Sequence, residues 1–200
     1  MALEQIHQIK GRAVYLPGDD VDTDRITPAR YLKAITFDEL SDALFRDERY
    51  TPDGLEKPHP LNDPRFKEAT IMLVGDNFGC GSSREHSPQA VLRSGFRAII
   101  GQGYAEIFFG NSTNISLVCL KASKADLETL AAAVQTSPAL ELEIDLDTLT
   151  LRYGGSSLKV EIPSSAQKSL TSGHWDPIAG LLEAGELLEA MDKKSARAGA

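Results

Sequence analysis

TIMLVGDNFGCGSSREHSPQAVLRSGFRAII, residues 70–100, carries the clearest structural signal in the chain. Its apolar run Thr70–Val74 is typical of a strand that is buried on both faces. Pro88–Ser94 predicts a helix, because it begins with a proline and Gly95 stands directly after it. Arg97–Ile100 is a second apolar run. A strand, a helix and a strand in this order predict a parallel βαβ unit.

Similar signals continue on both sides of this unit. Leu140–Asp145 and Thr148–Arg152 are joined by a short turn, which predicts a hairpin of antiparallel strands. Further strands are expected at Gly11–Leu16, Ser116–Leu120 and Leu158–Ile162, and helices at Phe37–Phe45 with Thr36 as N-cap, Ala105–Phe109, Lys124–Gln135 and Asp176–Met191. The sequence therefore predicts a layered α/β domain that combines parallel βαβ units with some antiparallel strands.

The chain is expected to form one domain. Its 200 residues contain no internal repeat and no shift in composition that would mark a boundary. Hydrophobic residues make up 42% and charged residues 25%, which is ordinary for a globular protein with a full core. We expect a single domain over residues 1–191 and a disordered tail at 192–200.

Charge and hydropathy argue against two classes of partner. The 21 Lys and Arg residues are outnumbered by 29 Asp and Glu, for a net charge of −8 and an isoelectric point near 5.0. Nucleic-acid binding needs a basic face. No stretch approaches the about 20 apolar residues that span a bilayer, and the N-terminus lacks the features of a signal peptide. We expect a cytoplasmic protein that binds neither nucleic acid nor membrane.

The cysteine count limits the metal chemistry of this chain. Cys80 and Cys119 are its only cysteines. Two thiols can close one disulfide, but they are too few to hold a zinc or iron–sulfur centre by cysteine alone. We expect both thiols to be reduced in a cytoplasmic protein. Any metal bound by this chain alone would need histidine or carboxylate ligands, and no metal-ligating set is predicted.

The glycine- and serine-rich segment GDNFGCGSSREHSP, residues 75–88, lies between a predicted strand and a predicted helix. Gly79 and Gly81 allow a ligand to approach the backbone closely, and backbone N–H groups before a helix attract anions. Ser82 and Ser83 add hydroxyl groups, and Arg84 adds a planar cation that suits a carboxylate or phosphate. The segment predicts an anion site.

Three common interpretations of such a loop fail. The dinucleotide pattern G-x-G-x-x-G needs a glycine where Arg84 stands, and the phosphate-binding loop needs a Gly-Lys-Ser/Thr ending that is absent. The nucleophile motif G-x-S-x-G is also missing, which argues against a serine hydrolase. A tight turn with a capping box, Ser82-x-x-Glu85, accounts for the spacing equally well.

The acidic segment that begins at Asp19 contains three basic residues within nine positions, Arg25, Arg30 and Lys33. These side chains could bring positive charge to an anionic ligand. A solvated surface is the favoured alternative, with the aspartates accepting hydrogen bonds from backbone N–H groups in turns.

Taken together, three motifs resemble one family. DDVDTDRITPARYL, GDNFGCGSSREHSPQAVL and RAIIGQGYAEIFFGNSTNISL occur in this order and are similar to the small subunits of 3-isopropylmalate dehydratase, the detached swivelling domain of the aconitase superfamily. The likeness runs from about Gly11 to Leu120 and extends more weakly to near Met191. It implies a layered β/β/α swivelling domain that closes over a separate large subunit.

The resemblance also implies a reaction. The large subunit would carry a [4Fe–4S] cluster, and this chain would bind none. The complex would be a hydro-lyase that interconverts 2-isopropylmalate and 3-isopropylmalate by dehydration and rehydration in leucine biosynthesis. This chain would be inactive by itself. Homoaconitate, citramalate and methylated malate are alternative substrates of related enzymes, and a non-catalytic anion-binding module is a further alternative.

Individual roles follow from the matching motifs. The resemblance implies that Ser82 is the general base, that Arg84 clamps a substrate carboxylate and that Ser83 assists by hydrogen bonding. Thr23 and Asp24 would border the site.

A second group of implied contacts lies near the end of the acidic segment. Arg30 is a candidate for a second carboxylate contact. Lys33 belongs to a segment, residues 31–34, that would meet the variable substituent of the substrate. Cys80 is interpreted as a packing residue.

Overall fold

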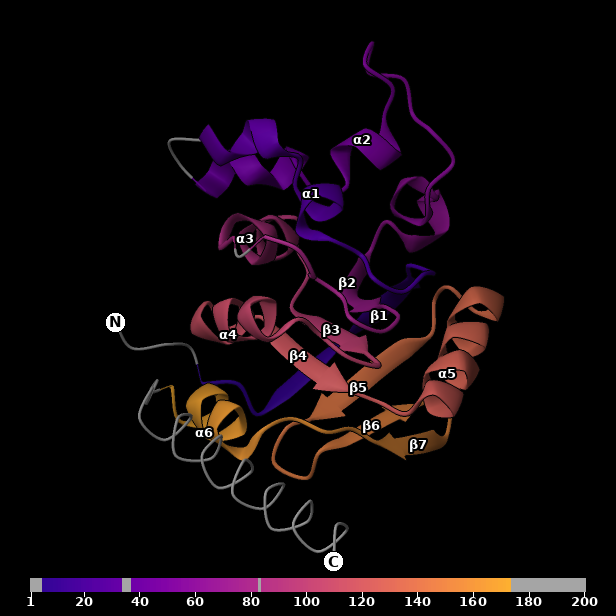
Figure 1. The fold of residues 1–200 in the computed structure, drawn as a ribbon. Coiled ribbons are helices and arrows are strands. Elements are labelled where there is room, and N and C mark those ends of the chain that lie inside the picture. Colours follow the sequence, from indigo (N-terminus) through magenta and orange to yellow (C-terminus); the bar gives the residue numbers. More distant parts are fainter. Residues whose placement is uncertain (1–4, 34–36, 83, 174–200) are drawn as a thin grey trace, which may run out of the picture.

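We describe residues 5–33, 37–82 and 84–173 of a computed structural model of the chain (Figure 1). Within them, seven strands form one sheet in the order β4-β3-β2-β1-β5-β6-β7. The strands are β1 (Gln8–Tyr15), β2 (Ala69–Leu73), β3 (Ala98–Gly101), β4 (Val118–Lys121), β5 (Glu141–Asp145), β6 (Thr150–Tyr153) and β7 (Ser156–Lys159).

The sheet is parallel in one half and antiparallel in the other. Strands β1 to β4 pair in parallel, so the predicted βαβ unit is confirmed. β5, β6 and β7 pair antiparallel, as the predicted hairpin required. Beyond β7, Glu161 and Lys121 exchange two backbone hydrogen bonds of 2.8 Å across the free edge of β4. The sheet therefore curls until its two ends meet.

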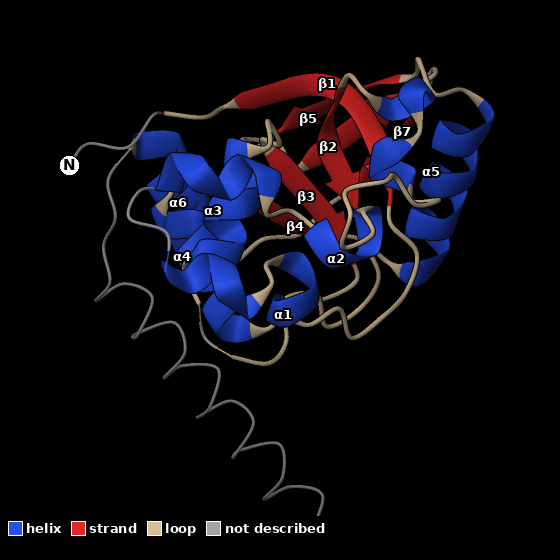
Figure 2. Cartoon of the chain, turned by 90° about the horizontal axis from the view of Figure 1, so that it is seen from above, coloured by secondary structure: helices blue, strands red, loops and turns tan. Residues whose placement is uncertain are grey.

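Helices cover both faces of the parallel half (Figure 2). They are α1 (Thr23–Ile26), α2 (Arg46–Arg49), α3 (His86–Arg93), α4 (Glu106–Asn114), α5 (Lys124–Thr136) and α6 (Ser164–Ser172). Successive residues of β2 and the residue after it explain the arrangement, since Ile71 and Leu73 pack in the core beneath α5 while Met72 and Val74 pack in the core beneath α3 and α4. A strand buried on both faces must be apolar throughout.

One predicted helix was wrong in kind. Phe37–Phe45 was expected to be α-helical, but the structure has a 3₁₀ segment at Phe37–Asp42 followed by turns. Leu40 and Ala43, both fully buried, pack against Ala90 of α3. Within the segment, Phe37 and Leu40 both pack in this cluster, and their spacing of three residues matches the three residues per turn of a 3₁₀ helix. The expected cap, Thr36, lies outside the described residues.

Near the C-terminal end of the described chain, α6 was not predicted. Its sequence SSAQKSLTS is rich in serine, which is a mediocre helix former. The buried residues Ala166, Ser169 and Leu170 nevertheless have helical spacing, and Gly173 ends the helix in a left-handed conformation with φ 70°. The predicted helix Asp176–Met191, the domain end at 191 and the tail at 192–200 lie outside the described residues.

Among the residues that the structure describes, no helix is both long and apolar enough to cross a membrane.

Candidate functional site

The loops that follow β1, β2 and β3 meet at one edge of the sheet. They come together there because parallel strands have their carboxyl ends on the same side, which is where α/β proteins usually bind ligands. The Gly79 N–H donates to the carbonyl of Val21 (2.7 Å), and the Thr23 N–H donates to the carbonyl of Cys80 (2.9 Å). The first two predicted motifs therefore run side by side in parallel.

Aspartates of the acidic segment hold this arrangement through backbone contacts. Asp19 accepts a hydrogen bond from the Asp76 N–H (2.8 Å), and Asp22 accepts one from the Arg25 N–H (2.8 Å). The expected local capping is confirmed for Asp22, whereas Asp19 joins two loops that are 57 residues apart in the sequence. The capping-box alternative for Ser82 is wrong, because α3 begins only at His86 and its N-cap, Glu85, makes no side-chain capping bond.

Thr23 is a buried residue that links the two loops by hydrogen bonds. It is 2% exposed, and its hydroxyl donates to the backbone carbonyl of Ser82 (3.0 Å). The Ser87 hydroxyl in turn donates to the Thr23 carbonyl (3.3 Å). Thr23 therefore fixes the backbone of Ser82, whose side chain is exposed.

Arg84 and Asp24 form an ion pair beside the same loop. Arg84 Nη1 donates to Asp24 Oδ1 at 2.5 Å, with 18% of the arginine side chain and 58% of the aspartate side chain exposed. The carboxylate engages one edge of the guanidinium, a group that carries five N–H donors in a planar fork. A charged group this well covered marks a built position rather than a solvated surface.

These side chains line one cavity of about 200 Å³. Its first wall is formed by the two loops and its second wall by the start of α4. The lining residues are Thr23, Gly79, Gly81, Ser82, Arg84, Ala105, Glu106, Ile107 and Phe108. The predicted site residues that line the cavity, Thr23, Ser82 and Arg84, all belong to the first wall. The second wall lies in the stretch GYAEIFF of the third motif. This motif is the sequence feature from which Glu106 and Ile107 could have been predicted as site residues.

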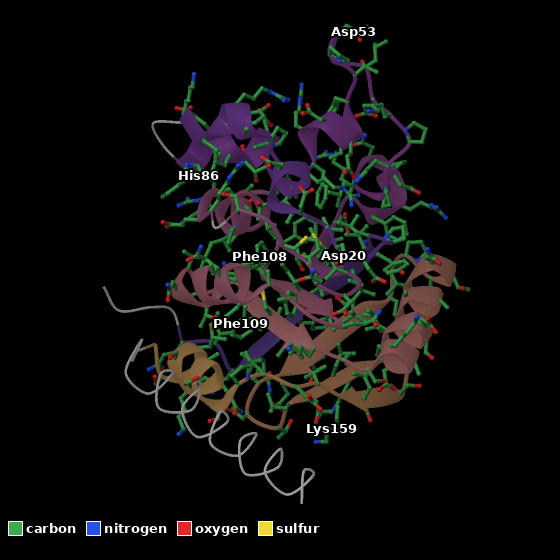
Figure 3. All side chains as sticks on the ribbon, viewed as in Figure 1. Asp20, Asp53, His86, Phe108, Phe109 and Lys159 are labelled. Atoms are coloured by element: carbon green, nitrogen blue, oxygen red, sulfur yellow. The ribbon has the colours of Figure 1, made fainter. Side chains whose placement is uncertain are left out.

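Close packing joins the two walls. The ring of Phe108, which is labelled in Figure 3, meets the ring of Phe78 edge to face, with centroids 5.3 Å apart. Gly79 has φ 80°, and a Cβ there would lie 2.3 Å from Cγ of Phe108. Only glycine fits, both in conformation and in space.

Other predicted residues lie elsewhere. Arg30 does not line this cavity and instead makes a bidentate pair with Asp47, at 2.8 and 2.6 Å. The hydrogen bonds raise the pKa of Arg30 and lower the pKa of Asp47. Lys33 is exposed at the end of the 3₁₀ segment Ala29–Lys33 and does not line the cavity either. Ser83 lies outside the described residues.

Both thiols are free and held in the protonated form. Burial, followed by the nearby Asp20 and Asp22, raises the pKa of the half-buried Cys80, and burial raises the pKa of Cys119 to about 12. In the described part of the chain, no three His, Cys, Asp or Glu side chains gather in a way that could hold a metal ion.

Comparison with known proteins gives the class first. Residues 3–125 match the family model described as the aconitase C-terminal domain. In solved structures, the fold resembles a 3-isopropylmalate dehydratase from Methanocaldococcus jannaschii with a TM-score of 0.62 and 28% identity, over 92% of this chain and 99% of that one.

Full-length relatives narrow the assignment. The chain is 53% identical over 192 residues to a 3-isopropylmalate dehydratase small subunit from Thermus thermophilus, covering 96% of both chains. It is 41% identical over 181 residues to one from Synechocystis, covering 90% of this chain and 89% of that one. The chain belongs to the family of 3-isopropylmalate dehydratase small subunits, within the aconitase C-terminal domains. The family and fold expected from the sequence are confirmed.

Proposed function

We propose that this chain completes the active site of a hydro-lyase that interconverts 2-isopropylmalate and 3-isopropylmalate in leucine biosynthesis. The observation that carries the proposal is the cavity in which an exposed serine hydroxyl and a covered arginine share one wall. The relatives are named small subunits, and that name implies a large partner subunit. We further propose that the complex is cytoplasmic.

Ser82 is the proposed general base. It would accept the proton from the carbon next to a substrate carboxylate while the hydroxyl group leaves the neighbouring carbon, which forms a double bond. Water then adds to this double bond with the positions of the hydrogen and the hydroxyl group exchanged, which completes the isomerisation. A serine hydroxyl can act in this way only where donors and positive charge stabilise its oxyanion. Arg84 and the fixed loop backbone are the candidates for that stabilisation.

Arg84 is the proposed carboxylate clamp. Asp24 holds one edge of its guanidinium, which leaves a planar, pre-positioned cation at the cavity wall. A substrate carboxylate can pair with such a fork in bidentate geometry. Thr23 is proposed to act through the Ser82 backbone, and Ser83 by hydrogen bonding. A substrate contact by Arg30 or Lys33 stays a prediction.

A [4Fe–4S] cluster is proposed for the large subunit and not for this chain. Cluster iron is held by several thiolates, whereas both thiols here have a raised pKa and Cys119 is buried. When bound on the partner, the cluster would supply the Lewis acid that assists departure of the hydroxyl group. Residues of this chain would then provide the base and the carboxylate clamp from the opposite side.

Reconstitution with the large subunit tests the proposal. The complex should turn over isopropylmalate, and Ser82→Ala should reduce kcat by about 10²-fold or more while subunit association is unchanged. Ser156→Ala, which removes an exposed hydroxyl from β7, is the matched control and should be silent. Activity of the isolated chain, or full activity of the Ser82 variant, would refute the proposal. Assays with homoaconitate, citramalate and methylated malate distinguish the related substrates.

A further inference from the structure

Two large apolar side chains are exposed in the described part of the chain, and they lie in different settings. Ile107 of α4 is 54% exposed and lines the Ser82 cavity. Leu55 is 64% exposed and belongs to the turn at residues 51–55, close to Asp53 at the protruding tip in Figure 3. Leu55 does not line the cavity that includes Ser82 and Arg84.

The backbone of Ile107 is held firmly in place. The preceding Ala105 donates its N–H to the carbonyl of Phe78 (3.0 Å) and accepts from the Phe109 N–H (3.0 Å). The next residue, Phe108, is 3% exposed and packed edge to face against Phe78. Ile107 is also β-branched, so its side chain has one strongly preferred rotamer in a helix. It therefore presents a fixed apolar surface.

The two walls of the cavity differ in chemistry. Ser82 and Arg84 on the loop wall suit a carboxylate and a proton transfer, whereas the α4 wall offers the hydrocarbon of Ile107 beside the exposed carboxylate of Glu106. Ala105 is small and Phe108 is almost fully buried, so Ile107 supplies most of the exposed apolar surface. Small-molecule sites commonly combine apolar lining with a few placed polar groups in this way.

We propose that Ile107 contacts the alkyl substituent of the substrate and helps the enzyme to select a branched substituent over a shorter one. This inference rests on the proposed function, because it takes the substrate to be a malate that carries an alkyl group. The carboxylate lies at Arg84, and the alkyl group lies against α4. Burial of hydrocarbon against Ile107 favours the branched substrate.

The test compares substrates on the reconstituted complex. Ile107→Ala should reduce kcat/KM for isopropylmalate about tenfold and change kcat/KM for the methyl-substituted analogue less than about twofold, since loss of a few methyl and methylene contacts in a pocket is worth about this much. Ile107→Val should give a kcat/KM for isopropylmalate between those of the wild type and Ile107→Ala. Leu55→Ala, the matched control, removes the other exposed apolar side chain and should leave both values unchanged.

Each other outcome has a defined meaning. If Ile107→Ala lowers kcat/KM equally for both substrates, or weakens subunit association measured by calorimetry without changing the substrate ratio, the inference is wrong and Ile107 is a subunit contact. If the wild-type complex turns over isopropylmalate and Ile107→Ala leaves the ratio of kcat/KM for the two substrates unchanged, only this inference fails. If the wild-type complex turns over no member of the panel, the proposed function fails, and this inference fails with it.

Discussion

Thr23 shows how a buried residue can position an exposed neighbour. Thr23 has almost no exposed surface to offer a substrate, yet its hydroxyl holds the Ser82 carbonyl and its own carbonyl receives the Ser87 hydroxyl. The serine that the family resemblance singled out is thereby fixed through its backbone, and its side chain is left exposed. Preorganisation of this kind lowers the cost of placing a catalytic group.

Local sequence revealed Ser82 and Arg84 because they stand two positions apart in one loop. It did not place Arg30, because its partner Asp47 lies 17 residues away and no local pattern links them. Nor did it show that Asp24 pairs with Arg84 across 60 residues. Contacts across the chain depend on how the loops fold together, so residue identities could be predicted and their pairings could not.

Gly79 gives a prediction at the scale of one residue. Gly79→Ala should lower the free energy of unfolding by more than about 2 kcal/mol, because the new Cβ would lie 2.3 Å from Phe108 at a backbone φ of 80°. Gly54→Ala is the control, since Gly54 has φ 88° with nothing within 4 Å, and it should cost only about 1 kcal/mol. Urea denaturation measures both, and equal losses would contradict the packing argument.

At the scale of elements, continuous apolar runs were the reliable signal. The strands β2 and β3 were predicted from such runs because both of their faces are buried, so that their core residues are apolar at successive positions. Segments whose conformation depends on packing against a neighbouring element were harder to predict from the sequence. The 3₁₀ segment Phe37–Asp42 follows the surface of α3, and the serine-rich α6 gains its stability from packing Leu170 into the core rather than from helix propensity.

The pair between Arg30 and Asp47 links two elements, the 3₁₀ segment Ala29–Lys33 and α2, and it predicts a pH dependence. Both side chains are more than half exposed, so Asp47→Asn should cost only about 0.5 kcal/mol of unfolding free energy at pH 7. The pair lowers the folded-state pKa of Asp47 below its unfolded value near 4. Its contribution is therefore present above the unfolded pKa and is lost as pH falls through the folded pKa.

Unfolding titrations of wild type and Asp47→Asn at several pH values measure this effect. The difference between the two proteins should disappear as the pH falls below the lowered folded-state pKa of Asp47, and it should shrink in high salt at pH 7. Glu128→Gln, which neutralises an exposed carboxylate on α5, is the comparison and should show no such pattern. If the difference in unfolding free energy between wild type and Asp47→Asn grows as the pH falls, the expected direction of the Asp47 pKa shift is wrong.

On the scale of the whole molecule, the curled sheet places the candidate site at one edge of the parallel strands. Three loops converge at the carboxyl edge of the parallel strands, and the antiparallel strands continue the sheet until the contact between Lys121 and Glu161 joins its two ends. The resulting cavity is small, about 200 Å³, and Arg84 is the one cation among the described residues that line it. A substrate with two carboxylates would leave one of them without a partner from this cavity wall.

Binding to the isolated chain follows from that geometry. Isopropylmalate should bind the free chain with a Kd weaker than about 1 mM, because one ion pair and one apolar contact leave little net binding energy after the entropy cost of association. Adding the large subunit should tighten binding by at least about tenfold, as the second carboxylate and the hydroxyl group gain partners. Calorimetry on the chain and on the complex measures both values, with Arg84→Ala as the variant that should abolish the weak binding. Micromolar binding by the isolated chain, together with full activity of Ser82→Ala, would instead establish an anion-binding module that has no catalytic role.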